Sequence, residues 1–380
     1  MPFFERIRLK NWRNFESADV QLAKRVFVVG QNASGKSNFL DAFRFLRDLV
    51  VPGGGFLKAV EDRGGVKTIR WFGARRDPNV LIEVDVSTDG KERWRYRIKF
   101  GLQQSTGKPV VKEECIWRRE GEEWESVLER RLGRGEEAGL FEQTYVEQRA
   151  VSANFKSLVD AFASVSYVHL APQIIREPAI RRYVPSLEWL GADWLKKVMS
   201  TNRRTTRARF RRIKDALRSV TGLQVEEIDA EMAEEGPILR VRCSNWRSYG
   251  LLQDERILSD GSIRLIVLLW SLLEKGGPLL WEEPEESLHP AVVRQLPPLF
   301  AQVQREGGRQ VILTTHSPDL LHDEGISGDE IILLQPQGDK TEAIEATKKA
   351  AVRELLRRGI PPGEVVLDVV APKERLLFDL

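Results

Sequence analysis

The stretch "VVGQNASGKS", residues 28–37, decides the fold of this chain, because residues 30–37 match the pattern G-x-x-x-x-G-K-[ST]. The apolar residues before it predict a strand, and the apolar periodicity of "SNFLDAFRFLRDLV" after it predicts a helix. Two glycines permit a tight turn whose amides, together with the helix N-terminus, face a phosphate. We therefore expect a phosphate-binding loop formed by Gly30, Gln31, Asn32, Ala33, Ser34, Gly35, Lys36, Ser37 and Asn38.

Two side chains of this loop carry the expected chemistry. Lys36 is placed to reach the β- and γ-phosphates of ATP, and Ser37 is placed to bind Mg²⁺. A glycine- and lysine-rich turn that merely caps a helix would contain the same letters. The flanking strand and helix favour the nucleotide site.

The segment "PLLWEEPEESLHP", residues 278–290, supplies two adjacent acids at the end of a short apolar run. A strand beside the phosphate loop can direct one acid toward the metal and the next toward the attacking water. Glu282 is the metal-side candidate, and Glu283 is the candidate base that polarises water. Alternatively, both glutamates only begin a solvated helix behind Pro284, where acids suit the N-terminal dipole.

Two further polar positions follow the same logic. His316 ends the apolar strand of "QVILTTHSPDLL", at the carboxyl end where ligands bind in open α/β sheets, although a structural histidine would also fit. His289 has a weaker case and could equally cap the following helix. Ser259 and Gly261 form a turn before a very apolar helix; this is an ordinary N-cap when taken alone, and a second helix N-terminus able to receive phosphate otherwise.

Strands that alternate with helices predict a parallel α/β core, and short strands separated by turn signals predict an antiparallel meander over about 66–150. We expect two β segments before Gly30, a final helix near 343–358 that stops at Pro361-Pro362, and no long coiled coil. The predicted organisation has four parts: 1–168, an N-terminal lobe with the phosphate loop and the antiparallel β subdomain; 169–222, an inserted helical, arginine-rich lid; 223–340, a C-terminal lobe; and 341–380, a helical tail of the same head.

Composition narrows the class of protein. The 59 basic and 56 acidic residues give a net charge of only +3, so an argument for nucleic acid needs local clustering. Two cysteines, Cys115 and Cys243, are too few for a disulfide framework or a thiolate metal site. Neither a signal peptide nor an 18-residue apolar run is found, so we expect a soluble, cytoplasmic protein with no membrane partner.

Read in order, "GQNASGKSN", "LSDGS", "LLWEEPEESLHP" and "ILTTHSPDLL" resemble the P-loop, signature, Walker B with D-loop, and switch histidine of the ABC-type ATPases, most closely the RecF/SMC/OLD-like branch. "IRLKNWRNFES" is similar to the opening strands of that branch. This resemblance implies a homodimer around two ATP and two Mg²⁺, in which the signature turn of one copy contacts the γ-phosphate held by the other. It also implies Lys36, Glu283 and His316 as catalytic residues in cis, Ser37 and Glu282 on the metal, Ser259 and Gly261 in trans, Arg13 near nucleotide, and a metal-coupling glutamine, either Gln148 or Gln173, with Gln148 taken as the metal candidate.

Two departures from the family pattern stand out. The signature reads LSDGS, without the second glycine and the glutamine of transporter ATPases, and this form is similar to the non-transporter branch. The Walker B acids are Glu-Glu where most relatives have Asp-Glu. We expect hydrolysis to survive, because Mg²⁺ usually keeps several waters and an acid that acts through water tolerates extra reach.

The segment from Arg203 to Arg218 has eight basic residues and one acid. Clustered arginines on a helix neutralise backbone phosphates without reading sequence, whereas a solvated face paired with acids elsewhere, such as 226–235, is equally compatible. The candidates for contact with DNA or RNA are Arg203, Arg204, Arg207, Arg209, Arg211 and Arg212.

Three functions follow from these features. The first is an ATP-driven dimerising switch that acts on nucleic acid in DNA repair or phage defence. The second is the nucleotide-binding subunit of a membrane transporter, against which the signature variant and the β-rich N-terminal region argue. The third is a nucleotide-sensing ATPase with slow hydrolysis that controls a separate effector protein, a toxin or a nuclease.

Overall fold

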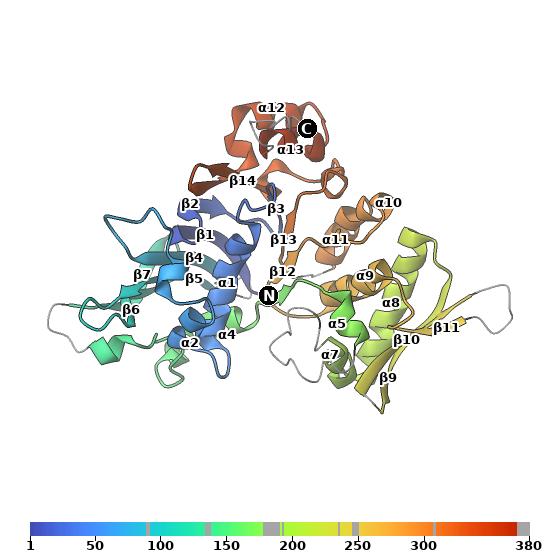
Figure 1. Cartoon of the computed structure of the whole chain (residues 1–380), viewed down its shortest axis with the longest axis horizontal. Helices are drawn as coiled ribbons and strands as arrows, with labels where there is room; N and C mark the ends of the chain where they lie inside the picture. The colour runs from blue at the N-terminus through green and yellow to red at the C-terminus, as the bar shows by residue number, and fades with distance from the viewer. Residues whose placement is uncertain are drawn as a thin grey trace, which may run out of the picture.

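The computed structural model describes residues 1–88, 92–133, 138–177, 191, 194–234, 236–244, 251–306 and 309–370. Two six-stranded sheets and one three-stranded sheet organise these residues (Figure 1). The predicted α/β class with an antiparallel β subdomain is confirmed. No coiled coil is evident in the described residues, where the helix α8 (Arg203–Thr221) has 19 residues.

The central sheet has the order β15-β14-β3-β13-β12-β8. Its neighbours run parallel except for the hairpin of β14 and β15. Every residue of β3, β12 and β13 is buried, as expected for a parallel sheet covered on both faces. The bounds are β3 Arg25–Val29, β8 Ser166–Val168, β12 Leu279–Glu282, β13 Val311–Thr315, β14 Ile331–Gln337 and β15 Lys340–Glu345.

Alternate residues of β3 enter two different hydrophobic cores. Val26 and Val28 pack into the core that contains α1 (Lys36–Val50) and α4 (Lys156–Ala163). Phe27 and Val29 pack into the core that contains α9 (Asp260–Leu273) and α11 (Leu296–Arg305). The strand that leads into the phosphate loop is therefore fixed from both faces, because side chains alternate across a sheet.

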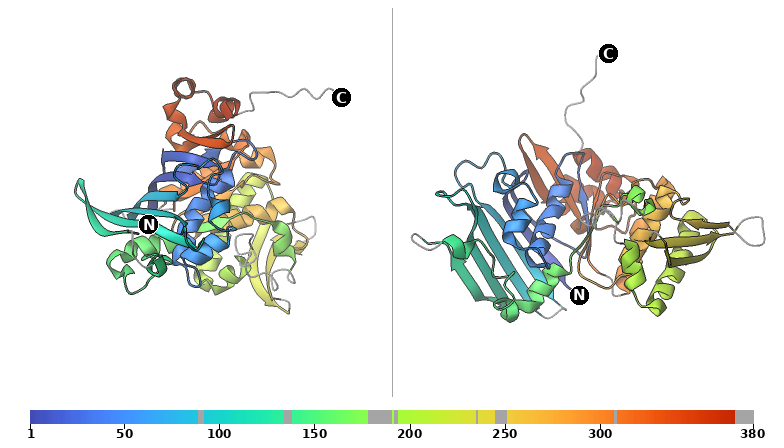
Figure 2. Two further views of the ribbon diagram at one scale, coloured as in Figure 1. Left: turned by 60° about the vertical axis from the view of Figure 1, so that its left-hand side comes forward. Right: turned by 60° about the horizontal axis from the view of Figure 1, so that its bottom comes forward.

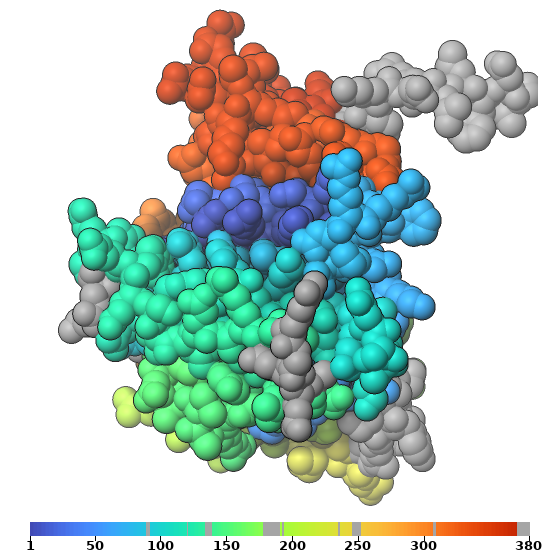
Figure 3. All heavy atoms as spheres, turned by 90° about the vertical axis from the view of Figure 1, so that its left-hand side faces the viewer, coloured from blue at the N-terminus to red at the C-terminus, as the bar shows by residue number. Residues whose placement is uncertain are grey.

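The antiparallel sheet has the order β2-β1-β4-β5-β6-β7. Its inner face packs on α1 and α4, and its outer face is turned away from them (Figures 2 and 3). The last four strands form the predicted meander. The bounds are β1 Phe3–Trp12, β2 Phe15–Gln21, β4 Val80–Thr88, β5 Glu92–Leu102, β6 Pro109–Glu120 and β7 Glu123–Arg131, with the short helices α2 Phe56–Glu61 and α3 Val66–Ile69 before β4.

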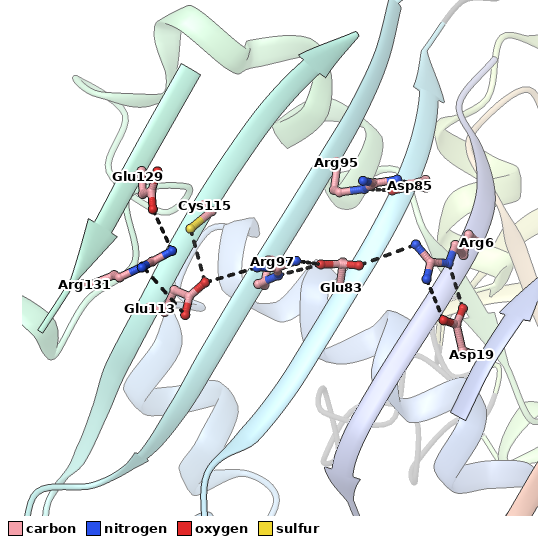
Figure 4. A network of polar contacts seen from close by, with 10 residues as sticks. All are labelled: Arg6, Asp19, Glu83, Asp85, Arg95, Arg97, Glu113, Cys115, Glu129 and Arg131. Carbon is pink, nitrogen blue, oxygen red and sulfur yellow. Dashed lines mark hydrogen bonds and ion pairs between the residues drawn. The ribbon is translucent and has the colours of Figure 1, made fainter. Parts of the chain in front are cut away.

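The outer face of this sheet carries a ladder of alternating charges (Figure 4). Glu83 lies 3.6 Å from Arg6 and 2.5 Å from Arg97, and Arg97 lies 3.3 Å from Glu113. Opposite charges on neighbouring strands each contribute roughly 0.2–1 kcal/mol. The ladder therefore stabilises the pairing of strands on this face, and its charges already have partners.

One expectation for the N-terminal segment was wrong. Residues before Gly30 form three strands, not two, because the chain turns back between β1 and β2. Asn11 and Arg13 have φ angles of 54° and 53°, in the left-handed region that such a tight reversal requires. The third strand, β3, belongs to the other sheet.

The arginine-rich segment is helical, but it does not stand alone. The helices α7 (Trp194–Ser200) and α8 contact an antiparallel sheet of β9 (Val225–Ala233), β10 (Gly236–Cys243) and β11 (Leu251–Asp254) (Figure 2). Phe210, Ile213 and Leu217 of α8 are buried in the second core. The short helix α5 (Pro172–Arg176) precedes this unit, and residues 178–190 of the predicted lid lie outside the described residues.

The prediction of one final helix near 343–358 was also wrong. Its first residues belong to β15, and the helix α12 covers only Ala350–Arg357. A further helix, α13 (Pro362–Val370), begins at Pro362, because proline is well suited to the first turn of a helix. Between β12 and β13 lie α10 (Pro290–Val293) and α11.

In the described part of the chain, we find no helix whose length and apolar character would let it cross a membrane. The boundaries 168/169, 222/223 and 340/341 stay predictions. The two predicted lobes share the central sheet, where β3 of the first lies between β13 and β14 of the second.

Candidate nucleotide site

The phosphate loop lies between β3 and α1, as predicted. Gly35 precedes α1 with a φ of 95°, and a side chain there would meet Asn14 at 2.1 Å. A Cβ atom at Gly30 would lie 2.3 Å from the hydroxyl oxygen of Ser34. Both glycines are therefore required by close approach, and Gly35 also by its left-handed backbone.

Lys36 occupies the centre of this loop. Its buried ammonium donates to the carbonyls of Gly30 and Gln31 at 3.0 and 3.2 Å, and it lies 3.4 Å from a carboxylate oxygen of Glu283. The hydroxyl of Ser34 is buried and has no hydrogen-bond partner among the described residues. The loop thus presents a cation and an unused donor, both of which suit a phosphate.

Asn14, which the sequence analysis missed, lies in the turn between β1 and β2 and forms hydrogen bonds with the phosphate loop. Its amide donates to the carbonyl of Ser34 at 3.0 Å and to the hydroxyl of Thr341 at 2.7 Å, and its carbonyl accepts from Asn38 at 2.8 Å. The predicted loop residue Asn38 therefore contacts the β1–β2 turn. Only the position of Asn14, directly after Arg13 in that turn, could have signalled this role.

Glu282 ends β12 and faces the first turn of α1. One of its carboxylate oxygens accepts a hydrogen bond from the hydroxyl of Ser37, and the other accepts one from the hydroxyl of Tyr167. The Nδ1 atom of His169 lies 3.7 Å from the second oxygen. The two predicted metal-side residues, Ser37 and Glu282, are brought together.

Tyr167 and His169 were missed by the sequence analysis. Tyr167 lies in β8, the parallel neighbour of β12, and His169 directly follows that strand, so both reach the same edge of the sheet as Glu282. Burial, and then the Glu282 carboxylate, raise the pKa of the Tyr167 hydroxyl above its usual value. The guanidinium of Arg44 lies over the Tyr167 ring, 4.2 Å from its centre, and makes a cation–π contact with it.

Glu283 lies between the other two predicted catalytic residues. One of its carboxylate oxygens is 3.2 Å from Nδ1 of His316 and 3.4 Å from the ammonium of Lys36. Its backbone has a φ of 44°, and its amide donates to the hydroxyl of Thr314 at 3.2 Å. Such a left-handed glutamate costs of order 1–3 kcal/mol and is often found at functional sites.

Glu285, two residues further on, is a buried acid that the sequence analysis did not single out. It accepts a hydrogen bond of 2.5 Å from the hydroxyl of Thr315. Burial raises the pKa of this carboxyl above its usual value, and the Thr315 hydrogen bond opposes that rise. Glu285 holds the turn after β12 against the end of β13.

The turn 258–261 begins α9, and Ser259 is its N-cap, accepting from the amide of Ser262 at 3.2 Å. A Cβ atom at Gly261 would lie 2.7 Å from the carbonyl oxygen of Ser287. The turn 258–261 is therefore in direct contact with the segment 278–290, which contains Glu282 and Glu283. His289 caps α10 by accepting from the amide of Ala291 at 3.2 Å.

The two glutamine candidates lie in different places. The side chain of Gln173 donates to Asp260 at 3.5 Å, and Arg176 pairs with the same Asp260, so this segment supports the signature turn. Gln148 lines a pocket of about 690 Å³ together with Val50 and Gly55, beyond the end of α1. Because the 15-residue helix spans roughly 20 Å, Gln148 is far from Ser37, and its choice as a metal ligand was wrong for this structure.

Arg13 lies beside the loop but points to an acid. Its guanidinium is 3.3 Å from Asp41 of α1, and its Nε atom is buried without a hydrogen-bond partner among the described residues. Asp41 also pairs with the buried Arg63 at 2.9 Å. Contact of Arg13 with a nucleotide stays a prediction.

The six arginine candidates of α8 divide into two groups. Arg209 lies 4.8 Å from the ring centre of Trp270 and 4.0 Å from Glu274, and Arg212 pairs with Glu306. These two arginines pair with acids elsewhere in the chain, as the second of the two alternatives for this helix has it, although the acids are not those of 226–235. The exposed members that form no ion pair with the described residues are Arg203, Arg204, Arg207 and Arg211.

The arrangement fits a nucleotide that carries its own metal. Among the described residues, no group of three His, Cys, Asp or Glu side chains could hold a metal ion by itself. Mg²⁺ is usually bound by one or two protein ligands plus phosphate oxygens and water. The hydroxyl of Ser37 and the carboxylate of Glu282 supply that kind of partial site beside the loop.

Comparisons with known proteins show the family of the chain. A family model described as "AAA domain, putative AbiEii toxin, Type IV TA system" matches residues 25–322, more than half of the chain. A 56-residue stretch is 43% identical to the protein named Endonuclease GajA of Bacillus cereus (strain VD045). That stretch covers 15% of this chain and 10% of the relative.

Solved structures show the same fold at low identity. An SmcHead bound to the C-winged helix domain of ScpA is similar with a TM-score of 0.55 and 14% identity, over 90% of this chain and 97% of that one. An Smc head domain with an extended coiled coil, bound to the C-terminal domain of ScpA derived from Pyrococcus furiosus, gives 0.51 and 14%, over 94% and 100%. The chain belongs to the AAA-domain family of the matching model, and its fold is similar to that of the Smc heads.

Proposed function

We propose that this chain binds and hydrolyses ATP with Mg²⁺, that two copies dimerise around two nucleotides, and that the dimer acts on nucleic acid in DNA repair or phage defence. The observation that carries the proposal is the placement of Glu283 between Lys36 and His316, beside the phosphate loop. A base, a phosphate-binding cation and a polar strand-end residue meet there, as phosphoryl transfer to water requires.

Each residue has one task in this proposal. Lys36 and the amides of residues 32–37 hold the β- and γ-phosphates, and Ser37 and Glu282 hold the metal side. Mg²⁺ held beside Ser37 and Glu282 would supply positive charge that neutralises the phosphates. Glu283 accepts a hydrogen bond, and then the proton, from the attacking water, while His316 contacts the γ-phosphate.

The contacts of Lys36 suggest how ATP switches the site on. In this structure the Lys36 ammonium lies 3.4 Å from Glu283. Phosphate oxygens compete for the same ammonium, because charge-assisted hydrogen bonds to phosphate are strong. Nucleotide binding would thus free the Glu283 carboxylate to orient water.

Dimerisation follows from the signature turn. We expect Ser259 and Gly261 at the N-terminus of α9 to contact the γ-phosphate held by the other copy, since a helix N-terminus favours an anion. Each nucleotide would then complete an interface, which couples ATP binding to association. Within each copy, Gly261 lies against Ser287. A shift of the segment that follows Glu282 and Glu283 would therefore move the turn 258–261, which we expect to contact the nucleotide of the other copy.

Action on nucleic acid rests on the exposed arginines of α8. Arg203, Arg207 and Arg211 follow one another at intervals of four and therefore share one face of the helix. A stripe of this kind binds phosphates without reading sequence. The name of the partly matching relative, an endonuclease, is consistent with a nucleic-acid substrate.

A second function deserves a test because the matched family is described in terms of a toxin and a type IV toxin–antitoxin system. In this alternative, the chain senses nucleotide with slow hydrolysis and controls a separate toxin or nuclease. The same site would then act as a switch that holds or releases the effector.

The test is the steady-state ATPase rate of the purified protein with and without double-stranded DNA, beside the variant Glu283→Gln. We expect DNA to raise the wild-type rate and the variant to lose it while still binding ATP. Absence of turnover under every condition, with ATP binding intact, would reject the hydrolytic proposal in favour of the effector switch. Replacing Glu282 by Asp should leave the rate near normal; if only that change produced turnover, the native Glu-Glu pair would be a brake.

A further inference from the structure

The segment 67–76, which runs from within α3 toward β4 and is here named the Phe72 loop, exposes one large aromatic side chain. Phe72 is 94% exposed, the highest value among the large apolar side chains that the structure describes. In Figure 3 the light-blue part of the chain that contains this loop protrudes beside the dark-blue strands β1 and β2. A single exposed apolar residue is ordinary on protein surfaces, so the argument depends on what surrounds it.

The Phe72 loop carries an uncompensated positive charge. Asp77, the acid that follows it, is 3.3 Å from Lys10 and 3.1 Å from Lys99, and its pKa falls to about 2 because hydrogen bonds from Asn79 and Lys99 outweigh its desolvation. That acid is therefore already paired. The basic residues of the loop that form no ion pair with any described acid are Lys67, Arg70, Arg75 and Arg76.

The loop is also held in a defined conformation. The indole nitrogen of Trp71 donates to the carbonyl of Asp339 at 3.0 Å, and the amide of Trp71 donates to the carbonyl of Asn11 at 3.0 Å. A Cβ atom at Gly73 would lie 2.3 Å from the Trp71 ring, so glycine lets that ring fold back. Trp71 anchors the loop, and its neighbour Phe72 is left in solvent.

We propose that the Phe72 loop binds single-stranded nucleic acid, with the Phe72 ring stacked on an unpaired base and the four basic side chains on the phosphates around it. A planar apolar ring among unpaired cations is the combination that binds single strands without sequence preference. A protein partner would have to supply several buried acids to satisfy the same cations, which is costly. This inference rests on the proposed action on nucleic acid and gives it a second surface, separate from α8.

Hydrogen bonds connect the Phe72 loop to the nucleotide site. The amide of Arg13 donates to the carbonyl of Ile69 at 2.5 Å, and the next residue, Asn14, donates to the carbonyl of Ser34 in the phosphate loop. A strand bound at Phe72 therefore contacts a segment that lies one short turn away from the phosphate loop. Single-stranded nucleic acid bound there should alter the ATPase rate.

The experiment measures binding of a fluorescein-labelled single strand of about 30 nucleotides by fluorescence anisotropy, over a series of salt concentrations. Phe72→Ala should weaken binding about 5- to 100-fold with an unchanged salt dependence, and Phe72→Trp should retain it. Arg75→Glu with Arg76→Glu should weaken binding and make the negative slope of log K against log salt shallower by about 1.4 or more. The mutated side chains are exposed, so the folded protein should retain its melting temperature.

Matched controls come from other surfaces. Leu140→Ala removes another exposed apolar side chain, 68% exposed, and Arg305→Glu with Arg357→Glu makes the same change of charge as the double loop variant. Both controls should bind the strand like the wild type.

The outcomes separate this inference from the proposed function. If Arg207→Glu with Arg211→Glu loses binding while both loop variants bind like the wild type, the inference is wrong and action on nucleic acid stands. If the wild type binds no single- or double-stranded DNA or RNA at physiological salt, both the inference about the Phe72 loop and the proposed action on nucleic acid are wrong. Loop variants that bind normally but no longer dimerise with ATP would make this loop a contact between copies instead, and would overturn the inference.

Discussion

At the scale of single residues, the substitution of Glu for the usual Asp in the Walker B segment has a structural explanation. Both oxygens of Glu282 accept hydrogen bonds, one from Ser37 and one from Tyr167. The longer side chain is therefore held in a defined orientation. Tyr167 is in turn packed under Arg44, so it acts as a positioning residue for the acid.

Tyr167→Phe tests this explanation. Loss of the hydroxyl should free one carboxylate oxygen of Glu282 and weaken metal use by about 10- to 100-fold, the usual effect of removing a group that orients a metal ligand. The measurement is the ATPase rate as a function of Mg²⁺ concentration. An unchanged Mg²⁺ dependence would contradict the positioning role, and a uniform loss of ATP binding with a lower melting temperature would indicate a purely structural one.

Glu285 gives a prediction about pH. Its folded pKa is raised by burial, so between its unfolded value of about 4.3 and the folded value the folded protein binds more protons, and the free energy of unfolding falls as pH rises. Glu285→Gln keeps an oxygen that accepts from Thr315 and removes this loss. The stability of the variant relative to the wild type should therefore increase from about pH 4 to about pH 7. Denaturant unfolding at the two pH values checks this, and a constant difference would contradict it.

At the scale of elements, the N-terminus of α9 is fixed by close contact between Gly261 and the backbone of Ser287. Gly261→Ala would place a carbon atom 2.7 Å from the backbone oxygen of Ser287, which also has a left-handed φ of 60°. Since backbone moves less easily than a side-chain tip, the turn 258–261 must shift. We expect normal ATP binding but a loss of turnover, measured by nucleotide fluorescence and phosphate release. Gly139→Ala, where no atom lies within 4 Å, is the matched control and should behave like the wild type.

Two arginines of α8, Arg209 and Arg207, should differ in what they contribute to stability and to nucleic-acid binding. Arg209→Ala removes a cation–π contact with Trp270 and should lower the free energy of unfolding by about 1 to 2 kcal/mol. Arg207→Ala removes an exposed side chain and should leave stability unchanged while weakening DNA binding. Chemical denaturation and anisotropy distinguish the two variants. Equal effects of both on either property would contradict the division of the arginines.

The elements that could be predicted from sequence are those with local signals. The phosphate loop, α1, α9 and the apolar strands β12 and β13 have motifs or periodicity within a few residues of themselves. Residues 343–345 at the end of β15 were predicted as the start of a helix, whereas pairing with β14 decides their conformation. Pairing of this kind cannot be predicted from the residues of the strand itself.

The same limit applies to the candidate site. Lys36, Ser37, Glu282, Glu283 and His316 were predicted and lie together, because each belongs to a motif at the end of a strand. Tyr167, His169 and Asn14 reach the site through strand order and turn geometry, which the sequence does not reveal. Gln148 was misplaced because its distance from the loop depends on the whole length of α1.

At the scale of the whole molecule, one sheet joins the two predicted lobes, so the phosphate loop and the Walker B acids are held in a single rigid layer. In the proposed dimer, a second copy would add the N-terminus of its own α9 to this site. Glu283→Gln with ATP should accumulate as a dimer in light scattering, because nucleotide is bound but not consumed. Monomers under that condition, with ATP bound, would contradict dimerisation around nucleotide.

The most direct test of the account is the ATPase rate of a mixture of two inactive variants, Lys36→Ala and Ser259→Arg. Each variant alone should be inactive, because in the proposed dimer every site needs Lys36 from one copy and Ser259 from the other. An equal mixture should recover about one quarter of the wild-type rate, since half of the dimers are mixed and each of these has one intact site. A mixture no more active than its separate components would contradict an ATPase whose sites are shared between two copies.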